Sequence, residues 1–186
     1  MITVKLSYSV LSNWSMGRQE EAVGQYLGKP LPATPAMELG KAYDELWSAH
    51  VTKTHRLPDE LGGGELKDPI VQQKYEKLIP FSDNYQILFR GVPDLVNTDT
   101  IVDFKCGRTK ANDYIDKWQL DAYKLLLPDA TIGKYLCFNP YLKTLSVAIK
   151  FLSDVNAENA LNNILTFGGE MIEFLAANRL IQDFKA

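Results

Sequence analysis

The stretch GVPDLVNTDTIVDFK, residues 91 to 105, says most about the architecture of the chain. Its second half, Thr100 to Lys105, predicts a short strand of apolar residues that also carries an aspartate and a lysine. Because side chains alternate along a strand, Asp103 and Lys105 share one face and Phe104 points to the other. Charged side chains are out of place in an apolar core, so this face predicts a functional site.

The first half of the stretch adds a second carboxylate. The turn NTD, residues 97 to 99, separates Thr100–Lys105 from a strand predicted over Tyr85–Val96, and antiparallel pairing across that turn brings Asp94 near Asp103. Pro93 cannot donate to a strand ladder, so we expect a bulge or bend there that re-aims the neighbouring side chain. Two converging carboxylates suit a hard divalent cation such as Mg²⁺ or Mn²⁺.

Hydrophobic periodicity predicts helices and strands on both sides of this stretch. The helices are expected at Tyr8–Leu27, from Pro35 to before Pro58, at Asp113–Leu127, and at Val155–Ile181 with a break allowed at Gly168 and Gly169. The strands are expected at Tyr75–Phe81, Tyr85–Val96, Thr100–Lys105, Gly133–Asn139 and Thr144–Phe151, the first three as an antiparallel meander. This order predicts an α/β fold, a single domain over residues 1–186 with a central mixed β-sheet flanked by helices.

Composition limits the classes of protein to consider. A chain of 186 residues with 46% hydrophobic and 23% charged residues is typical of one globular domain. Two cysteines are too few for a disulfide framework or a four-cysteine iron–sulfur cluster. The net charge of −3 argues against a broad nonspecific nucleic-acid coat but allows local binding. The N-terminus lacks a secretory pattern and no apolar run can span a bilayer, so we expect a cytoplasmic protein without membrane contact.

Further polar residues follow the central strand. Gln119 and Tyr123 are four residues apart and therefore lie on one helix face, where they can hold a substrate backbone or support a metal-bound water. Lys105 can orient an attacking water and stabilise charge on a phosphorus atom. The cations at Lys105, Arg108, Lys110 and Lys117 form either a solvated face or a local phosphate track. Each segment alone is a weak signal, and only their order and spacing favour a site.

The segments GVPD, DFK and QLDAY together resemble the PD-(D/E)XK nuclease superfamily, in particular RecB-like nucleases. Gly91 and Asp94 match its Gly-x-x-Asp strand, Asp103 and Lys105 its Asp/Glu-x-Lys strand, and Gln119 and Tyr123 its Gln-x-x-x-Tyr helix. The opening Ser7 to Leu11 is similar to a Ser-x-Ser-x-Leu start in that group. The resemblance implies a restriction-endonuclease-like core, Asp94 and Asp103 as ligands of Mg²⁺ or Mn²⁺ assisted by the Phe104 carbonyl, and Lys105 as the catalytic lysine.

The first helix of that family usually carries a histidine in a Gly-x-x-x-His arrangement. Here Asp44 stands at that place after Gly40, and an aspartate can still bind Mg²⁺. Glu38 and Glu45 compete for the same role. Asp44 lies at the border of the apolar helix face, whereas Glu45 lies about 200° from Tyr43 and is expected in solvent.

The resemblance implies a metal-dependent deoxyribonuclease, with exonuclease action on DNA ends in recombination, repair or phage replication as the favoured form. One alternative is a nucleic-acid-binding module of the same fold that is silent or depends on a partner. Another is a structural protein in which Asp103 and Lys105 form a surface pair. Cleavage of RNA, the number of metal ions and the oligomeric state stay open.

Overall fold

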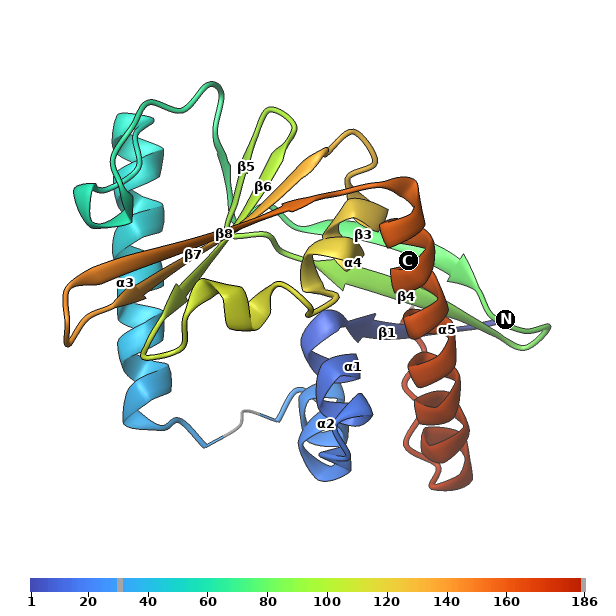
Figure 1. Ribbon diagram of the computed structural model, residues 1–186. Helices are drawn as coiled ribbons and strands as arrows, with labels where there is room; N and C mark the ends of the chain where they lie inside the picture. Colours follow the sequence, from blue (N-terminus) through green and yellow to red (C-terminus); the bar gives the residue numbers. More distant parts are fainter. Residues whose placement is uncertain (30–31, 185–186) are drawn as a thin grey trace. The chain divides into compact units, whose positions relative to one another are not determined.

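The computed structural model describes residues 1–29 and 32–184 (Figure 1). The chain is an α/β protein with mixed sheets flanked by helices, as predicted. Its contacts divide it into two compact units, one formed by Met1–Pro32, Tyr75–Gly91 and Glu158–Ala186, the other by Ala33–Lys74 and Val92–Ala157. That residues 1–186 act as one domain stays a prediction. None of the helices in the described part is long and apolar enough to cross a membrane.

The first unit is built on a three-stranded sheet. Its strands, in spatial order, are β1 (Ile2–Ser7), β4 (Tyr85–Gly91) and β3 (Tyr75–Pro80). β4 is parallel to β1 and antiparallel to β3, so this sheet is mixed. The helices of the unit are α1 (Tyr8–Ser15), α2 (Gln19–Tyr26) and most of α5 (Asp154–Ala177).

The N-terminal part of this unit differs from the prediction in two ways. The strand β1 was not predicted, although its buried residues Val4 and Leu6 are two positions apart, as expected for one face of a strand. The single helix expected over Tyr8–Leu27 is divided into α1 and α2, because Gly17 takes a left-handed conformation at φ +73° and ends α1. The start at Tyr8 is confirmed, and the Ser7 side chain caps it by accepting the Val10 amide.

The helix α5 continues through Gly168 and Gly169 instead of breaking there. A Cβ atom on Gly168 would stand 2.8 Å from the Ile87 side chain, and one on Gly169 would stand 2.7 Å from the Phe81 ring. The glycines therefore permit close packing of the helix. The helix ends at Ala177, before the predicted Ile181, and Arg179 beyond it is left-handed at φ +56°.

The second unit contains a five-stranded sheet in the order β2, β5, β6, β7, β8. These strands are Ile70–Val71, Leu95–Asn97, Thr100–Cys106, Ile132–Asn139 and Thr144–Phe151. β6 and β7 are parallel, and the other neighbouring pairs are antiparallel. The accompanying helices are α3 (Pro35–Thr54) and α4 (Gln119–Leu126), with 3₁₀ turns η1 (Asp59–Leu61) and η2 (Ala111–Tyr114).

The two faces of this sheet are packed by different helices. Trp47 of α3 lies in one apolar cluster with Phe104 and Phe138. Leu120 and Tyr123 of α4 lie in another cluster with Ile101 and Tyr135. Since neighbouring residues of a strand point to opposite faces, α3 and α4 cover opposite faces of β6.

The predicted meander is wrong at its centre. The residues expected to form one strand, Tyr85–Val96, form β4 and β5, which belong to different sheets. Pro93 lies in the link between them, where its missing amide interrupts the ladder. The helix expected over Asp113–Leu127 is also shorter, because the Asp113 carboxylate accepts the Lys110 amide at 3.1 Å and closes η2 as a separate turn.

Candidate active site

The strand β6 presents the central pair of charges. The Lys105 ammonium lies 2.5 Å from Oδ2 of Asp103, whose side chain is only 2% exposed. The Phe104 ring lies on the other face, against Trp47 at a centroid separation of 5.7 Å. The predicted alternation along DFK is therefore confirmed. The sequence dictates this arrangement because Ile101 and Val102 anchor the strand between two apolar layers.

Asp94 lies in the link between β4 and β5, not on the paired strand that was predicted. Its Oδ2 accepts the Phe104 main-chain N–H at 2.6 Å. A main-chain amide of β6 thus fixes the Asp94 carboxylate beside Asp103, and the predicted proximity of the two carboxylates holds although the strand assignment does not.

Asp44 is the third carboxylate, on α3. Its Oδ2 accepts a hydrogen bond from Gln72 Nε2 at 2.8 Å, whereas its buried Oδ1 has no hydrogen-bond partner among the described residues. The competing residues Glu38 and Glu45 are exposed, and Glu45 pairs with Lys41 at 3.7 Å. Of these three side chains, Asp44 is the one that lines the pocket together with Asp94 and Asp103.

One pocket of about 570 Å³ in the second unit collects these groups. It is lined by Ala36, Met37, Gly40, Lys41, Asp44, Asp94, Asp103, Phe104, Lys105, Cys106, Gln119 and Tyr123. The lining includes all seven residues that were predicted as metal ligands or catalytic residues: Asp44, Asp94, Asp103, Phe104, Lys105, Gln119 and Tyr123. Arg108, Lys110 and Lys117 are exposed, and Arg108 lies over the Tyr141 ring at 5.1 Å.

The helix α4 reaches the site through Gln119 and Tyr123. Gln119 Nε2 donates to Asp103 Oδ1 at 2.8 Å and lies 3.1 Å from the Tyr123 hydroxyl. That hydroxyl donates to the Val92 carbonyl at 3.2 Å, which ties α4 to the segment that carries Asp94. The amide therefore orients the Asp103 carboxylate, and the phenol holds the segment that carries Asp94.

Burial and neighbouring charges shift the pKa values of the ionisable groups in the site. Burial raises the pKa of Asp94 well above its ordinary value, and the charges of Asp103 and Asp44 raise it further. Burial also raises the pKa of Asp103, against the opposing effect of Lys105. For Lys105, burial alone lowers the pKa, but the Asp103 carboxylate outweighs it, so the net pKa is raised and the ammonium stays charged.

The donor set fits a hard divalent cation. Carboxylates that repel one another, with an unsatisfied oxygen on Asp44, are the chemistry that a cation relieves. In residues 1–29 and 32–184, however, no three acidic, histidine or cysteine side chains are arranged to hold a metal ion as they stand. The Lys105 ammonium occupies one oxygen of Asp103.

Sequence reasoning missed Gln72. Its side chain holds Asp44, and its main-chain N–H donates to the Asp94 carbonyl at 3.1 Å. It has a left-handed φ of +49° directly after β2, a strand of two residues. Such a short strand has no periodicity, so no sequence pattern pointed to this residue.

Sequence comparison does not identify a family. No family model matches the chain, and no curated protein matches it significantly.

Comparison with solved structures identifies the fold. An exonuclease candidate from Eubacterium rectale superposes with a TM-score of 0.60 at 11% identity, over 98% of this chain and 85% of that chain. The alkaline exonuclease of Laribacter hongkongensis in complex with dAMP gives 0.55 at 14% identity, over 95% of both chains. A phage-related exonuclease from Haemophilus somnus gives 0.51 at 10% identity, over 89% of this chain and 83% of that chain. The chain therefore has a fold found in exonucleases.

Proposed function

We propose that the chain is a metal-dependent DNA nuclease of the PD-(D/E)XK superfamily, of the RecB-like type, that hydrolyses phosphodiester bonds. One observation carries the proposal: Asp44, Asp94, Asp103 and Lys105 converge in one pocket. The fold shared with exonucleases supports it independently.

The metal ion would be Mg²⁺ or Mn²⁺, held by Asp94 and Asp103 with the Phe104 carbonyl and Asp44. Oxygen ligands of this kind are those that both ions prefer. When bound, the ion would supply Lewis-acid activation of water and neutralise phosphate charge. Burial raises the pKa of Asp94, and the ion would relieve the repulsion by Asp103 and Asp44 that raises it further.

Lys105 provides the positive charge of the protein itself. Because its raised pKa keeps it protonated, its ammonium donates hydrogen bonds and can hold a water molecule or a phosphate oxygen beside Asp103. Gln119 donates to Asp103 and Tyr123 donates to the Val92 carbonyl, so both act as positioning residues.

The substrate would be DNA, and the favoured action is removal of nucleotides from DNA ends. Two observations support this choice: the similar folds belong to exonucleases, and one of them was solved with dAMP. The sequence resemblance to RecB-like nucleases suggests work in recombination, repair or phage replication.

The Gln119→Ala variant tests the positioning role. We expect cleavage to fall about 10- to 100-fold, because loss of a residue that orients a metal ligand typically has this effect. The unfolding midpoint should fall by a few degrees, because the buried Asp103 carboxylate loses one hydrogen bond, so cleavage is measured well below that midpoint. Rates are compared with those of Gln73→Ala, an exposed glutamine outside the pocket. Equal loss in both variants would contradict a specific role for Gln119.

The proposal as a whole is tested by digesting linear and circular DNA, single- and double-stranded, with Mg²⁺, Mn²⁺ or chelator. We expect cleavage that requires a metal ion and spares circles. Cleavage of circles would make the enzyme an endonuclease, and a preference for RNA would change the substrate. If the folded protein binds DNA but cuts nothing under any condition, the alternative of a silent or partner-dependent binding module replaces the nuclease.

A further inference from the structure

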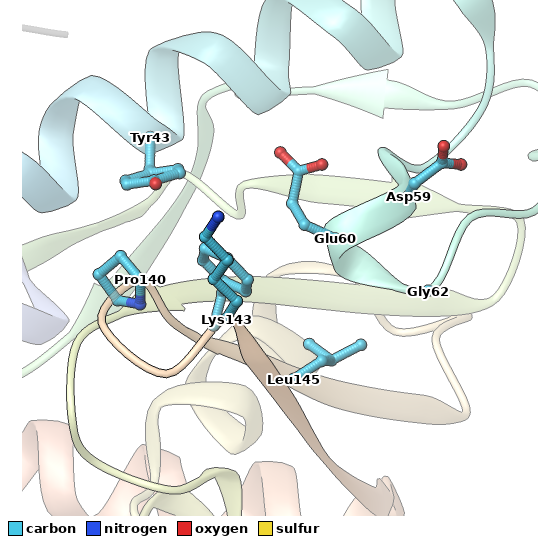
Figure 2. Close-up of a pocket in the computed structure, with 8 residues that line it drawn as sticks. Tyr43, Asp59, Glu60, Gly62, Pro140, Lys143 and Leu145 are labelled. Carbon is cyan, nitrogen blue, oxygen red and sulfur yellow. The ribbon is translucent and has the colours of Figure 1, made fainter.

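A second pocket, of about 450 Å³, lies in the same unit and has no role in the proposed chemistry (Figure 2). It is lined by Tyr43, Asp59, Glu60, Gly62, Phe138, Pro140, Lys143 and Leu145. These residues come from α3, from η1 with the glycine that follows it, and from β7, β8 and the turn between them. The volume lies within the range of small-molecule sites.

This pocket adjoins the candidate active site. Tyr43 and Asp44 are consecutive on α3, and one lines each pocket. On the sheet, Phe138 of β7 lies opposite Cys106 of β6, which lines the active site. The Gly107 N–H also donates to the Phe138 carbonyl at 3.0 Å. The two pockets therefore have neighbouring lining residues on α3 and on the β6–β7 pair.

The walls of the pocket suit a flat ring. The Tyr43 ring packs against Trp47 and Phe138, at centroid separations of 5.2 and 5.6 Å, which holds its orientation. Figure 2 shows the Tyr43 and Pro140 rings on one side of the pocket and Leu145 on another. Aromatic and apolar side chains of this kind stack nucleobases in proteins that bind single strands.

Two polar groups converge on the same space. Glu60 Oε1 accepts the Trp47 indole N–H at 3.0 Å, which fixes the carboxylate. Its second oxygen and the remaining lone pair of Oε1 can still accept hydrogen bonds. The Lys143 ammonium points toward the region between Tyr43 and Glu60 (Figure 2). Within the described residues, no ion pair joins Lys143 to Glu60 or Asp59. An acceptor and a cationic donor are thus both free to meet a ligand.

We propose that this pocket binds the base of a nucleotide next to the scissile bond, with Glu60 accepting from the base and Lys143 neutralising a phosphate. The inference rests on the proposed nuclease function and adds a base preference to it. Guanine offers a carboxylate two adjacent N–H donors, from its ring nitrogen and its amino group, whereas thymine offers one. Guanine should therefore bind better than thymine.

The test measures binding of dGMP and TMP to the metal-free protein by calorimetry, where no cleavage occurs. In Glu60→Gln, the side-chain oxygen can keep the Trp47 hydrogen bond, so the amide NH₂ faces the pocket. We expect dGMP affinity to fall about tenfold, because a charged acceptor becomes a donor, and the preference over TMP to disappear. In Lys143→Gln, both nucleotides should bind about three- to tenfold more weakly.

The control is Lys67→Gln, which removes the same charge from an exposed position outside both pockets and should bind as wild type. Thermal unfolding checks that each variant is folded. Tighter binding of both nucleotides by Glu60→Gln would overturn the inference, because it would show that the carboxylate only repels phosphate. Unchanged affinities in both Glu60→Gln and Lys143→Gln would also overturn it.

Failure of this inference is distinguishable from failure of the nuclease proposal. If wild type shows metal-dependent cleavage but neither Glu60→Gln nor Lys143→Gln affects nucleotide binding, only the base-binding inference is contradicted. Base-selective binding that depends on Glu60, in a protein that cuts no nucleic acid, would support the base-binding role of the pocket and contradict the nuclease proposal.

Discussion

Replacing Lys105 by alanine is expected to reduce DNA cleavage about 10²- to 10³-fold, the usual effect of removing one group that stabilises charge in a transition state. The ammonium is the only cation paired with Asp103 among the described residues, at 2.5 Å, and its raised pKa keeps it charged. Single-turnover cleavage of a labelled linear DNA, with saturating Mg²⁺, measures the chemical step directly.

The same variant should be less stable when metal is absent. Asp103 is 2% exposed, and removing its partner leaves a buried carboxylate, which costs about 3 kcal/mol or forces the group to take up a proton. Mg²⁺ should therefore raise the unfolding midpoint of Lys105→Ala more than that of wild type, because the ion replaces the lost positive charge.

Lys53→Ala is the matched control, since this exposed lysine of α3 lies outside the pocket. It should cleave DNA as wild type does. A Lys105→Ala protein that is folded, binds Mg²⁺ and still cuts at the wild-type rate would show that Lys105 is only the ion-pair partner of Asp103.

The strand that carries Asp103 and Lys105 was predictable because its information is local. Apolar residues on both sides of a two-residue alternation determine which side chains share a face, and β6 occupies Thr100–Cys106 against the predicted Thr100–Lys105. The spacing of Gln119 and Tyr123 on a helix was equally local, and both side chains meet the site.

The errors arose where distant segments decide the structure. The strand β1 is defined by its parallel pairing with β4, more than 80 residues away, and a six-residue N-terminal run does not reveal that pairing. Whether Tyr85–Val96 forms one strand or two depends on the sheet that each half joins. Gln72 reaches Asp44 from a segment 28 residues away, so its part in the site was visible only in three dimensions.

Replacing Asp94 by asparagine is expected to abolish cleavage, by 10³-fold or more, while stabilising the metal-free protein. The first effect follows because a metal ion supplies several kcal/mol to the transition state, and each 1.36 kcal/mol is about a factor of ten in rate. The second follows because burial, Asp103 and Asp44 all raise the pKa of Asp94, so its charged form is disfavoured in the fold.

Asparagine is suited to separating the two effects. Its side-chain oxygen can still accept the Phe104 N–H, so the hydrogen bond recorded at 2.6 Å is kept while the charge is removed. Relief of the repulsion should stabilise the chelated protein by on the order of 1 kcal/mol. For a protein of this length, that corresponds to a rise of about 2–4 °C in the unfolding midpoint.

Thermal unfolding should therefore rank the two proteins in opposite order: Asp94→Asn is expected to be more stable than wild type with chelator and less stable with Mg²⁺. Wild type should gain about 2.7 kcal/mol when Mg²⁺ is present at a hundred times its Kd, whereas Asp94→Asn should gain little. The exposed Asp116→Asn loses the same charge outside the pocket and should behave as wild type in both conditions. If Asp94→Asn instead unfolds below wild type in chelator and gains as much from Mg²⁺, then Asp94 stabilises β6 through Phe104 and does not bind the ion.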